Sequence, residues 1–232
     1  MGQKSKRVRE IAKLIPADKV FKLSEAIELL KKCPPVKFDQ TVDISIRLGL
    51  DAKKSDQTVR GSVSLPKGTG KKVKVLVFAK GDKVQEALNA GADYVGFEEY
   101  FERVKNGWTD FDAIVVTPDL MREVGKLGKV LGPRNLMPTP KAGTVTQDVG
   151  EAVTRVKAGQ IEFKMDKTSV INCPVGKVSF AAGDLQENIE SLMNAVQRAK
   201  PATAKGQYIK GLYLSSTMGP GLKLDINEFA AN

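Results

Sequence analysis

The chain has 232 residues, with 37 lysines and arginines against 27 aspartates and glutamates, so its net charge is +10. Histidine is absent, which excludes Ser-His-Asp and Cys-His hydrolases and histidine-bound zinc. The two cysteines, Cys33 and Cys173, are too far apart for a zinc knuckle, and so few thiols suit a reducing compartment. No apolar run approaches the roughly 20 residues that cross a bilayer, so we expect a soluble, intracellular protein.

The first third of the chain predicts two helices followed by two strands. Residues 3–15 suit a short basic helix that ends before a proline. Ser24 is the expected N-cap of a second helix, which ends before Pro34. Residues 41–50 and 58–65 alternate between apolar and polar side chains, and each predicts a strand with one face in water.

The middle of the chain has a different pattern, in which buried strands alternate with helices. Residues 73–79 are almost all apolar, as expected for a strand that is covered on both faces. Strands and helices in alternation are typical of a parallel, Rossmann-like sheet. The expected strands are 73–79, 94–96 and 111–117, and the expected helices are 84–88, 98–105, 120–127 and 149–156.

Alternating strands return toward the C-terminus. Between them, residues 184–199 give the clearest helical pattern of the chain, with Asp184 as the expected cap. The expected strands of this region are 161–165, 169–175, 178–180, 211–215 and 222–225.

The two ends of the chain therefore share a pattern that the middle lacks. The simplest account is an α/β chain of two domains, in which a discontinuous α+β domain, residues 1–67 and 159–232, is interrupted by an inserted Rossmann-like α/β domain, residues 68–158. The insert holds 14 bases and 12 acids, a net of +2, whereas the remainder holds 23 and 15, a net of +8. The expected hinge residues are the junction glycines Gly68, Gly70 and Gly159.

The glycines near residue 68 do not form a phosphate-binding loop. A P-loop needs glycine where this chain has Leu65, and serine or threonine where it has Lys72. A dinucleotide fingerprint also fails, because Val73 occupies its third glycine position. These mismatches disfavour an enzyme that acts on a nucleotide, and we expect no catalytic residue, metal or cofactor.

The surplus of positive charge points to a polyanion, either a nucleic acid or an acidic membrane surface. A membrane-surface protein needs a long amphipathic helix with Trp or Phe on its apolar face, and residues 3–15 offer neither. The segment 215–221 favours RNA, because its small hydroxyl residues and glycines let a backbone approach closely. Phe38 is open to two interpretations: a buried ring belongs to the core, whereas an exposed ring stacks on a base.

Four segments, taken in order, form one pattern: Lys37–Val42, Arg60–Lys71, Leu120–Pro138 and Ser216–Pro220. Together they resemble the family of bacterial large-subunit ribosomal protein one, which sits on the mobile L-one stalk of the ribosome. The resemblance covers essentially the whole chain and depends on all four segments, since one alone would not be specific.

The resemblance implies a non-enzymatic protein of the large ribosomal subunit, in the cytoplasm as part of the ribosome, with the two-domain fold described above. It implies binding to the stalk region of large-subunit ribosomal RNA, a part in releasing exit-site tRNA, and repression of its own operon through the mRNA leader. We expect no membrane partner and a monomer when free. The RNA-binding residues expected are Lys37, Phe38, Thr41, Asp166, Lys167, Thr168, Ser169, Ser215, Ser216, Thr217, Met218 and Gly219.

Three residues depart from the family pattern. Asn135 stands where glycine is usual, although Asn tolerates left-handed backbone better than most residues. Lys164 replaces an arginine and so loses a bidentate fork. Met165 replaces a small or polar residue, which puts contacts from that strand end in doubt.

Overall fold

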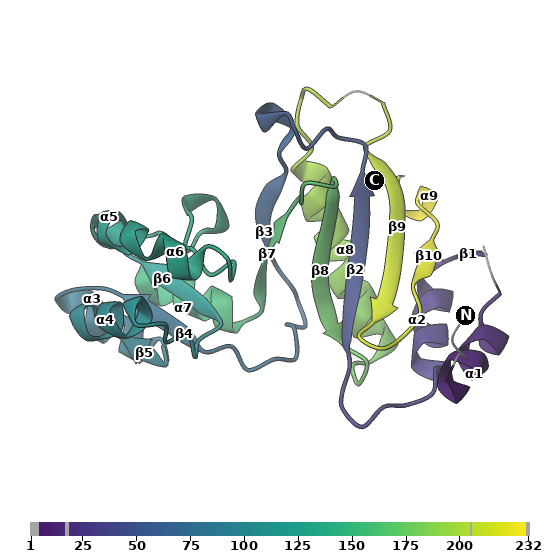
Figure 1. Cartoon of the computed structure of the whole chain (residues 1–232), viewed down its shortest axis with the longest axis horizontal. Helices are drawn as coiled ribbons and strands as arrows, with labels where there is room; N and C mark the ends of the chain where they lie inside the picture. The colour runs from purple at the N-terminus through teal and green to yellow at the C-terminus, as the bar shows by residue number, and fades with distance from the viewer. Residues whose placement is uncertain (1–4, 17–18, 205, 231–232) are drawn as a thin grey trace. The chain divides into compact units, whose positions relative to one another are not determined.

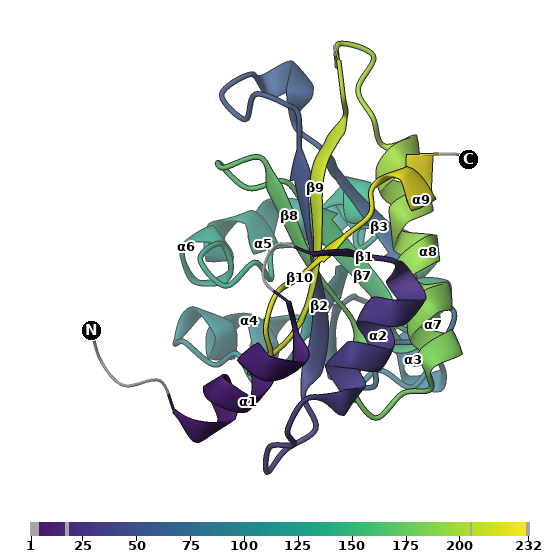
Figure 2. The same cartoon turned by 90° about the vertical axis from the view of Figure 1, so that its right-hand side faces the viewer.

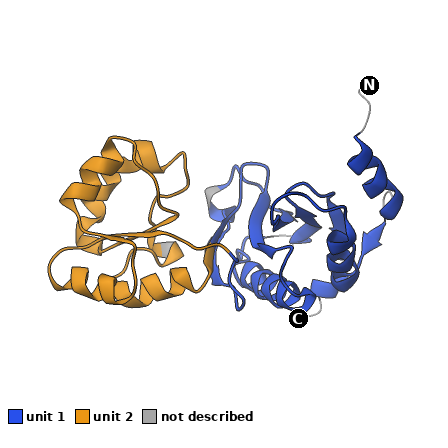
Figure 3. Ribbon diagram, turned by 90° about the horizontal axis from the view of Figure 1, so that it is seen from below, with its two compact units in different colours: residues 1–70, 162–232 blue, residues 71–161 orange. Residues whose placement is uncertain are grey.

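The computed structural model describes residues 5–16, 19–204 and 206–230. Gln3 and Lys4, expected in the first helix, lie outside these residues. The chain is a mixed α/β protein (Figure 1). It divides into two compact units, of which unit 1 comprises residues 1–70 and 162–232 and unit 2 comprises residues 71–161 (Figure 3).

Unit 1 is built on a five-stranded sheet with the order β1-β10-β9-β2-β8. The central strand β2 pairs antiparallel with both neighbours, so that Ile44 lies opposite Cys173 and Leu214. Because successive side chains alternate, every second residue of β2 points into the core. The strands are β1 (Val20–Phe21), β2 (Thr41–Leu48), β8 (Val170–Lys177), β9 (Ile209–Ser216) and β10 (Leu222–Leu224).

Helices α2 and α8 lie on the same side of this sheet (Figure 2). Their apolar residues, such as Ile27 of α2 and Ile189 of α8, are almost fully buried, and each contributes about 1.5–3 kcal/mol. The helices of unit 1 are α1 (Lys6–Leu14), α2 (Leu23–Lys32), η1 (Ser55–Gln57), α8 (Ala182–Arg198) and α9 (Asn227–Ala230). A separate two-stranded sheet pairs β3 (Arg60–Ser64) with β7 (Gln160–Lys164).

The predicted caps of α2 and α8 are both wrong. α2 begins at Leu23, so Ser24 lies inside it, and the N–H of Leu23 donates instead to the carboxylate of Glu228 at 2.9 Å. A contact from the far end of the chain thus replaces the local cap. α8 begins at Ala182, which puts Asp184 in the first turn, where its charge still complements the helix dipole.

The strand predicted at 169–175 is confirmed as β8, which runs two residues further, but the separate strand predicted at 178–180 is wrong. The pairing of β8 with β2 continues until Thr41 lies opposite Lys177, and an irregularity beside Val42 absorbs one extra residue. Residues 178–180 then turn away from the sheet.

Unit 2 is a three-stranded parallel sheet, order β5-β4-β6, covered on both faces. Helix α4 and the helical segment 121–131 pack on one face, and α3 and α7 pack on the other. All four residues of β4 are therefore buried. The elements are β4 (Val75–Phe78), α3 (Asp82–Asn89), β5 (Tyr94–Val95), α4 (Glu98–Lys105), β6 (Ala113–Val116), η2 (Pro118–Leu120), α5 (Met121–Val124), η3 (Gly125–Leu127), α6 (Gly128–Leu131), η4 (Pro140–Ala142) and α7 (Val149–Lys157).

A buried amide holds the chain where it leaves unit 1. The side chain of Asn188 on α8 is fully buried and accepts the N–H of Lys67 at 3.0 Å. Its NH₂ group donates to the carbonyls of Gly68 at 3.0 Å and Val175 at 2.8 Å. The junction glycines have the left-handed φ values that favour glycine: Gly68 (65°), Gly70 (71°) and Gly159 (102°). A hinge at these glycines stays a prediction.

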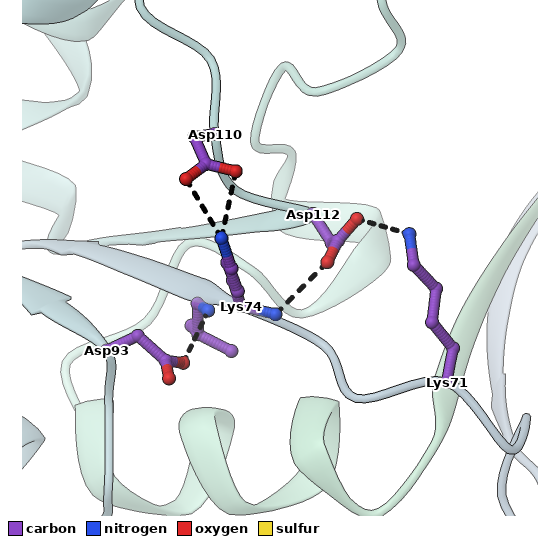
Figure 4. Close-up of polar contacts among 6 residues, drawn as sticks. Lys71, Lys74, Asp93, Asp110 and Asp112 are labelled. Carbon is purple, nitrogen blue, oxygen red and sulfur yellow. Dashed lines mark hydrogen bonds and ion pairs between the residues drawn. The ribbon is translucent and has the colours of Figure 1, made fainter.

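Charged side chains hold the chain where it joins unit 2 (Figure 4). Asp112 accepts the N–H of Lys74 at 3.1 Å and pairs with the ammonium of Lys71, while the ammonium of Lys74 contacts both oxygens of Asp110 at 2.9 Å. Burial alone would raise the pKa of Asp112. The bonds from Lys71 and Lys74 have the larger combined effect, and the pKa lies below its ordinary value. Only residues 69–70 separate this anchored stretch from the one held by Asn188.

Candidate nucleic-acid interface

Two segments singled out in the sequence meet at one end of the unit 1 sheet. Strand β9 ends at Ser216, which lies opposite Val42 near the start of β2. The next residue, Thr217, donates its N–H to the carbonyl of Thr41 at 3.0 Å, and its hydroxyl accepts the N–H of Thr41 at 3.0 Å. These bonds join the turn at Ser215–Gly219, here called the 215–219 turn, to the loop that precedes β2.

The backbone of Met218 is held on both sides while its side chain faces solvent. Its N–H donates to the buried amide oxygen of Gln40 at 3.0 Å, and its carbonyl accepts a 2.7 Å bond from the guanidinium of Arg7 on α1. Arg7 also donates to the carbonyl of Pro34 at 3.2 Å. The Met218 side chain is 56% exposed. The sequence did not predict a role for Gln40 or Arg7 at this turn. Both bind the backbone of a residue that is distant in the sequence, and no local pattern indicates such a bond.

The loop before β2 presents an aromatic ring. Phe38 is 53% exposed, so it is not a core residue, and Lys37 beside it is exposed as well. The carboxylate of Asp39 accepts the hydroxyl of Ser179 at 2.7 Å, which ties the loop to the turn after β8. An exposed ring next to a base is the arrangement that stacks on an unpaired nucleotide.

Thr41 is positioned by a lysine from the neighbouring strand. The ammonium of Lys177 donates to the hydroxyl of Thr41 at 2.9 Å. On the same side of β2, burial raises the pKa of Asp43, and the positive charge of Lys177 offsets part of this effect. Lys177 is half-buried and so places a positive charge at the base of the surface that Thr41 and the 215–219 turn form.

Ser216 supports the turn from beneath. Its side chain is 4% exposed, and its hydroxyl has no hydrogen-bond partner among the described residues. A Cβ atom on Gly219 would lie 2.2 Å from that hydroxyl oxygen, so a side chain at this position requires the hydroxyl or the turn to move. A direct contact from Ser216 to RNA stays a prediction, and in this structure the hydroxyl packs inward.

The predicted segment Asp166–Ser169 forms a tight turn of its own. One carboxylate oxygen of Asp166 accepts the N–H and the hydroxyl of Thr168, both at 2.7 Å, and the N–H of Val170 at 2.9 Å. Ser169 has a left-handed φ of 63° and donates its hydroxyl to the carbonyl of Leu50 at 2.7 Å. Thr168 and its neighbour Lys167 are exposed.

This second turn does not lie beside the 215–219 turn. It precedes β8, which runs antiparallel to β2, and it therefore sits near Leu48, at the opposite end of β2 from Thr41. At about 3.4 Å per residue, the two ends of β2 are about 24 Å apart. The uncovered face of the sheet connects them: Ser45, Asn172 and Tyr213 form a row across three strands there, with a 2.7 Å bond from the Ser45 hydroxyl to Asn172.

The turn at 166–169 is expected to loosen in acid. Burial raises the pKa of Asp166, but the bonds from Val170 and Thr168 outweigh it and hold the pKa below the ordinary value of 3.8. A lowered pKa means that the carboxylate stabilises the folded turn above pH 3.8 and that this contribution disappears as the pH falls through the lowered pKa. Protection of the Thr168 and Val170 amides against hydrogen exchange should therefore fall over that range.

The variant Asp166→Asn provides the control for this titration. Its amide oxygen keeps the shape of the turn but carries no charge, so amide protection in the variant should not change with pH. Identical pH profiles for the variant and the natural chain would show that the Asp166 carboxylate does not hold the turn.

The residues that depart from the family pattern have distinct structural roles. Asn135 has a φ of 55°, the left-handed conformation that its usual glycine adopts without strain. Met165 is 4% exposed and packs inside unit 1, so it offers no surface. Lys164 is exposed at the end of β7.

No helix within the described part of the chain is long and apolar enough to cross a membrane. The described residues also contain no cluster of His, Cys, Asp or Glu that is arranged to hold a metal ion. Both cysteines are free and buried, and burial, with a smaller effect of Asp43, raises the pKa of Cys173 to about 12.

A basic chain that presents an aromatic ring, a methionine and hydroxyl-lined turns to solvent has the features of a nucleic-acid-binding protein. The sequence model of the ribosomal protein L1p/L10e family matches residues 29–220, and the chain belongs to this family. It is 66% identical over 228 residues to large ribosomal subunit protein uL1 of Protochlamydia amoebophila (strain UWE25), covering 98% of this chain and 97% of that protein.

Proteins of the same name from two Chlamydia species match over the full length of both chains. The identity over 232 residues is 60% for Chlamydia caviae and 56% for Chlamydia pneumoniae. Membership of the family makes this chain a ribosomal protein, with a structural role and not an enzymatic one.

Proposed function

We propose that this chain, as a constituent of the large ribosomal subunit, binds the stalk region of large-subunit ribosomal RNA through unit 1. The observation that carries the proposal is the held backbone and exposed side chain of Met218, which is bonded to the loop that presents the exposed ring of Phe38. Because the backbone of Met218 is already held, binding costs the rotamer entropy of its side chain but no further ordering of the backbone.

The surface suits folded RNA better than a uniform polyanion. Hydroxyls, backbone groups and an apolar side chain meet sugar edges, 2′-hydroxyls and splayed bases, which are the features by which proteins distinguish RNA. The expected RNA contacts lie at both ends of β2, and the polar sheet face between them gives the RNA a continuous surface. In this proposal unit 1 is the split RNA-binding domain and unit 2 is the Rossmann-like insert.

Two further roles belong to this proposal. We propose that the chain takes part in releasing exit-site tRNA while it holds the ribosomal RNA. We also propose that it represses its own operon, because an mRNA leader of the same shape would occupy the same turns. Ribosomal RNA and the leader should then compete for binding, and Met218→Ala should weaken both complexes by the same factor.

A deletion tests whether unit 1 carries the main RNA site. Replacing residues 71–161 by a short linker should leave most of the affinity for stalk RNA, because the excess charge and every expected contact lie in unit 1. Filter binding measures the affinity of the deletion variant for stalk RNA, with an unrelated duplex RNA as control. A loss of more than about 3 kcal/mol, or roughly 150-fold, would place part of the main site in unit 2.

The close approach of Gly219 to Ser216 gives a test of the turn itself. Gly219→Ala should lower RNA affinity at least about tenfold, because the new methyl group meets the Ser216 hydroxyl and the turn must shift. The double variant Ser216→Ala/Gly219→Ala removes that hydroxyl and should recover most of the affinity. A double variant as weak as the single one would show that the clash is not the cause.

A further inference from the structure

One surface of unit 2 has no part in the function proposed above. It lies on the helical segment 121–131, which is formed by α5, η3 and α6 in succession. Leu120, Val124, Leu127 and Leu131 are buried at intervals of about one helical turn and face the sheet. At about 100° per residue, the exposed side chains of Arg122, Lys126 and Lys129 project from the opposite side. We call these three residues the basic face.

In the described part of unit 2, the charges of the basic face form no ion pair, whereas seven of the 14 bases of unit 2 do. None of the ion pairs among the described residues involves Arg122, Lys126 or Lys129, or the exposed Arg134 that follows them. The bases of unit 2 that do form ion pairs are Lys71, Lys74, Lys83, Arg103, Lys105, Arg155 and Lys157. The net charge of unit 2 is only +2, yet three positive charges without a described ion-pair partner lie together on one helical face.

The backbone next to the basic face is uncovered. A Cβ atom added at Gly125 or Gly128 would meet nothing within 4 Å, so the helix surface beside the bases is open. The segment 119–141 contains no Phe, Tyr or Trp. A surface that binds single-stranded nucleic acid relies on such rings for stacking, and a membrane-binding helix relies on Trp or Phe.

We propose that the basic face binds the sugar–phosphate backbone of double-helical RNA, separate from the RNA that unit 1 binds. From Arg122 to Lys129 the helix rises about 10 Å, at 1.5 Å per residue. One strand of duplex DNA carries a phosphate about every 3.4 Å of its axis, and on this scale the basic face is about three phosphates long. The bare glycines let the strand approach closely. The deep, narrow groove of duplex RNA keeps side chains from the base edges, so the contact is independent of sequence.

The inference rests on the proposed RNA-binding role of the chain but not on which RNA unit 1 recognises. The test uses the full chain saturated with stalk RNA and measures fluorescence anisotropy of a short, labelled RNA duplex of arbitrary sequence at low salt. The variant Arg122→Gln/Lys126→Gln/Lys129→Gln should bind this duplex at least about tenfold more weakly. The slope of log K against log salt should become shallower by about 3.

A matched control removes the same charge elsewhere in unit 2. Lys83→Gln/Lys105→Gln/Arg155→Gln also lowers the net charge by three, but it alters bases that are paired within their own helices. The control should keep its affinity for the duplex, and both variants should keep their affinity for stalk RNA and their melting temperature. Equal weakening of both variants would reduce the effect to net charge and overturn the proposal.

Other outcomes separate this inference from the proposed function. If stalk RNA fails to bind, the proposed function falls, and the duplex titration is run on the free chain. If stalk RNA binds but the basic-face variant binds the duplex as tightly as the natural chain, the proposal that the basic face binds duplex RNA is wrong, and the proposed function of unit 1 is unaffected. Displacement of the duplex by poly-glutamate of equal charge would assign the surface to acidic proteins instead of RNA.

Discussion

Replacing Met218 by alanine is expected to lower affinity for stalk RNA at least about tenfold, or ~1.4 kcal/mol, without changing the melting temperature. In the free chain the side chain is 56% exposed and contributes little to the core. Full burial against RNA would make it worth about 1.5–3 kcal/mol. The control is Leu88→Ala, which shortens an exposed apolar side chain of unit 2, away from the proposed RNA site. It should leave the affinity for stalk RNA unchanged.

Thr217→Ala should weaken binding to a similar degree, for a different reason. Its hydroxyl already accepts the N–H of Thr41 and lies where RNA would desolvate it, so losing it leaves a polar partner unsatisfied at about 1–3 kcal/mol. Thr217→Ser keeps the hydroxyl and should keep the affinity. Intact binding in the Met218 and Thr217 alanine variants, with a lowered melting temperature, would mean that the turn serves only to close the hairpin.

Asn188→Ala is expected to give a large loss of stability, at least about 3 kcal/mol. The change leaves the N–H of Lys67 and the carbonyls of Gly68 and Val175 without their buried partner, and each such group costs about 1–3 kcal/mol. Thermal unfolding should show a fall in melting temperature of roughly 10 °C.

Asn194→Ala provides the comparison for Asn188, because Asn194 is exposed on the same helix. Its melting temperature should match that of the natural chain. Equal stability of the Asn188 and Asn194 variants would show that water replaces the three buried bonds without cost.

Much of the fold was predictable because its elements carry local patterns. Helix α4 has the predicted limits 98–105, and the alternation of β2 identified its buried residues. The apolar run at 73–79 marked a strand covered on both faces. The cap of α2 could not be predicted in this way, because Glu228 comes from the other end of the chain.

The candidate site shows the same division. Patterns of hydroxyls, glycines and an aromatic ring drew attention to the 215–219 turn and to Phe38. They gave no sign of Arg7 and Gln40, which bind the backbone of Met218 through bonds that only the tertiary fold creates. The position of Asp166–Ser169 follows from strand direction, since the turn before a strand antiparallel to β2 must lie at the far end of β2.

Asn188 holds the chain at Lys67 and Gly68, where it first passes from unit 1 to unit 2, and this crossing has a mechanical consequence. A pull on unit 2 that is transmitted backward along the chain reaches Gly68 and Lys67 before it reaches β3. The load therefore passes sideways into α8, a helix of 17 residues packed in the core, and through Val175 into the central sheet. At this crossing the load is thus taken up before it reaches β3, so β3 is shielded by a bond network in the core of unit 1.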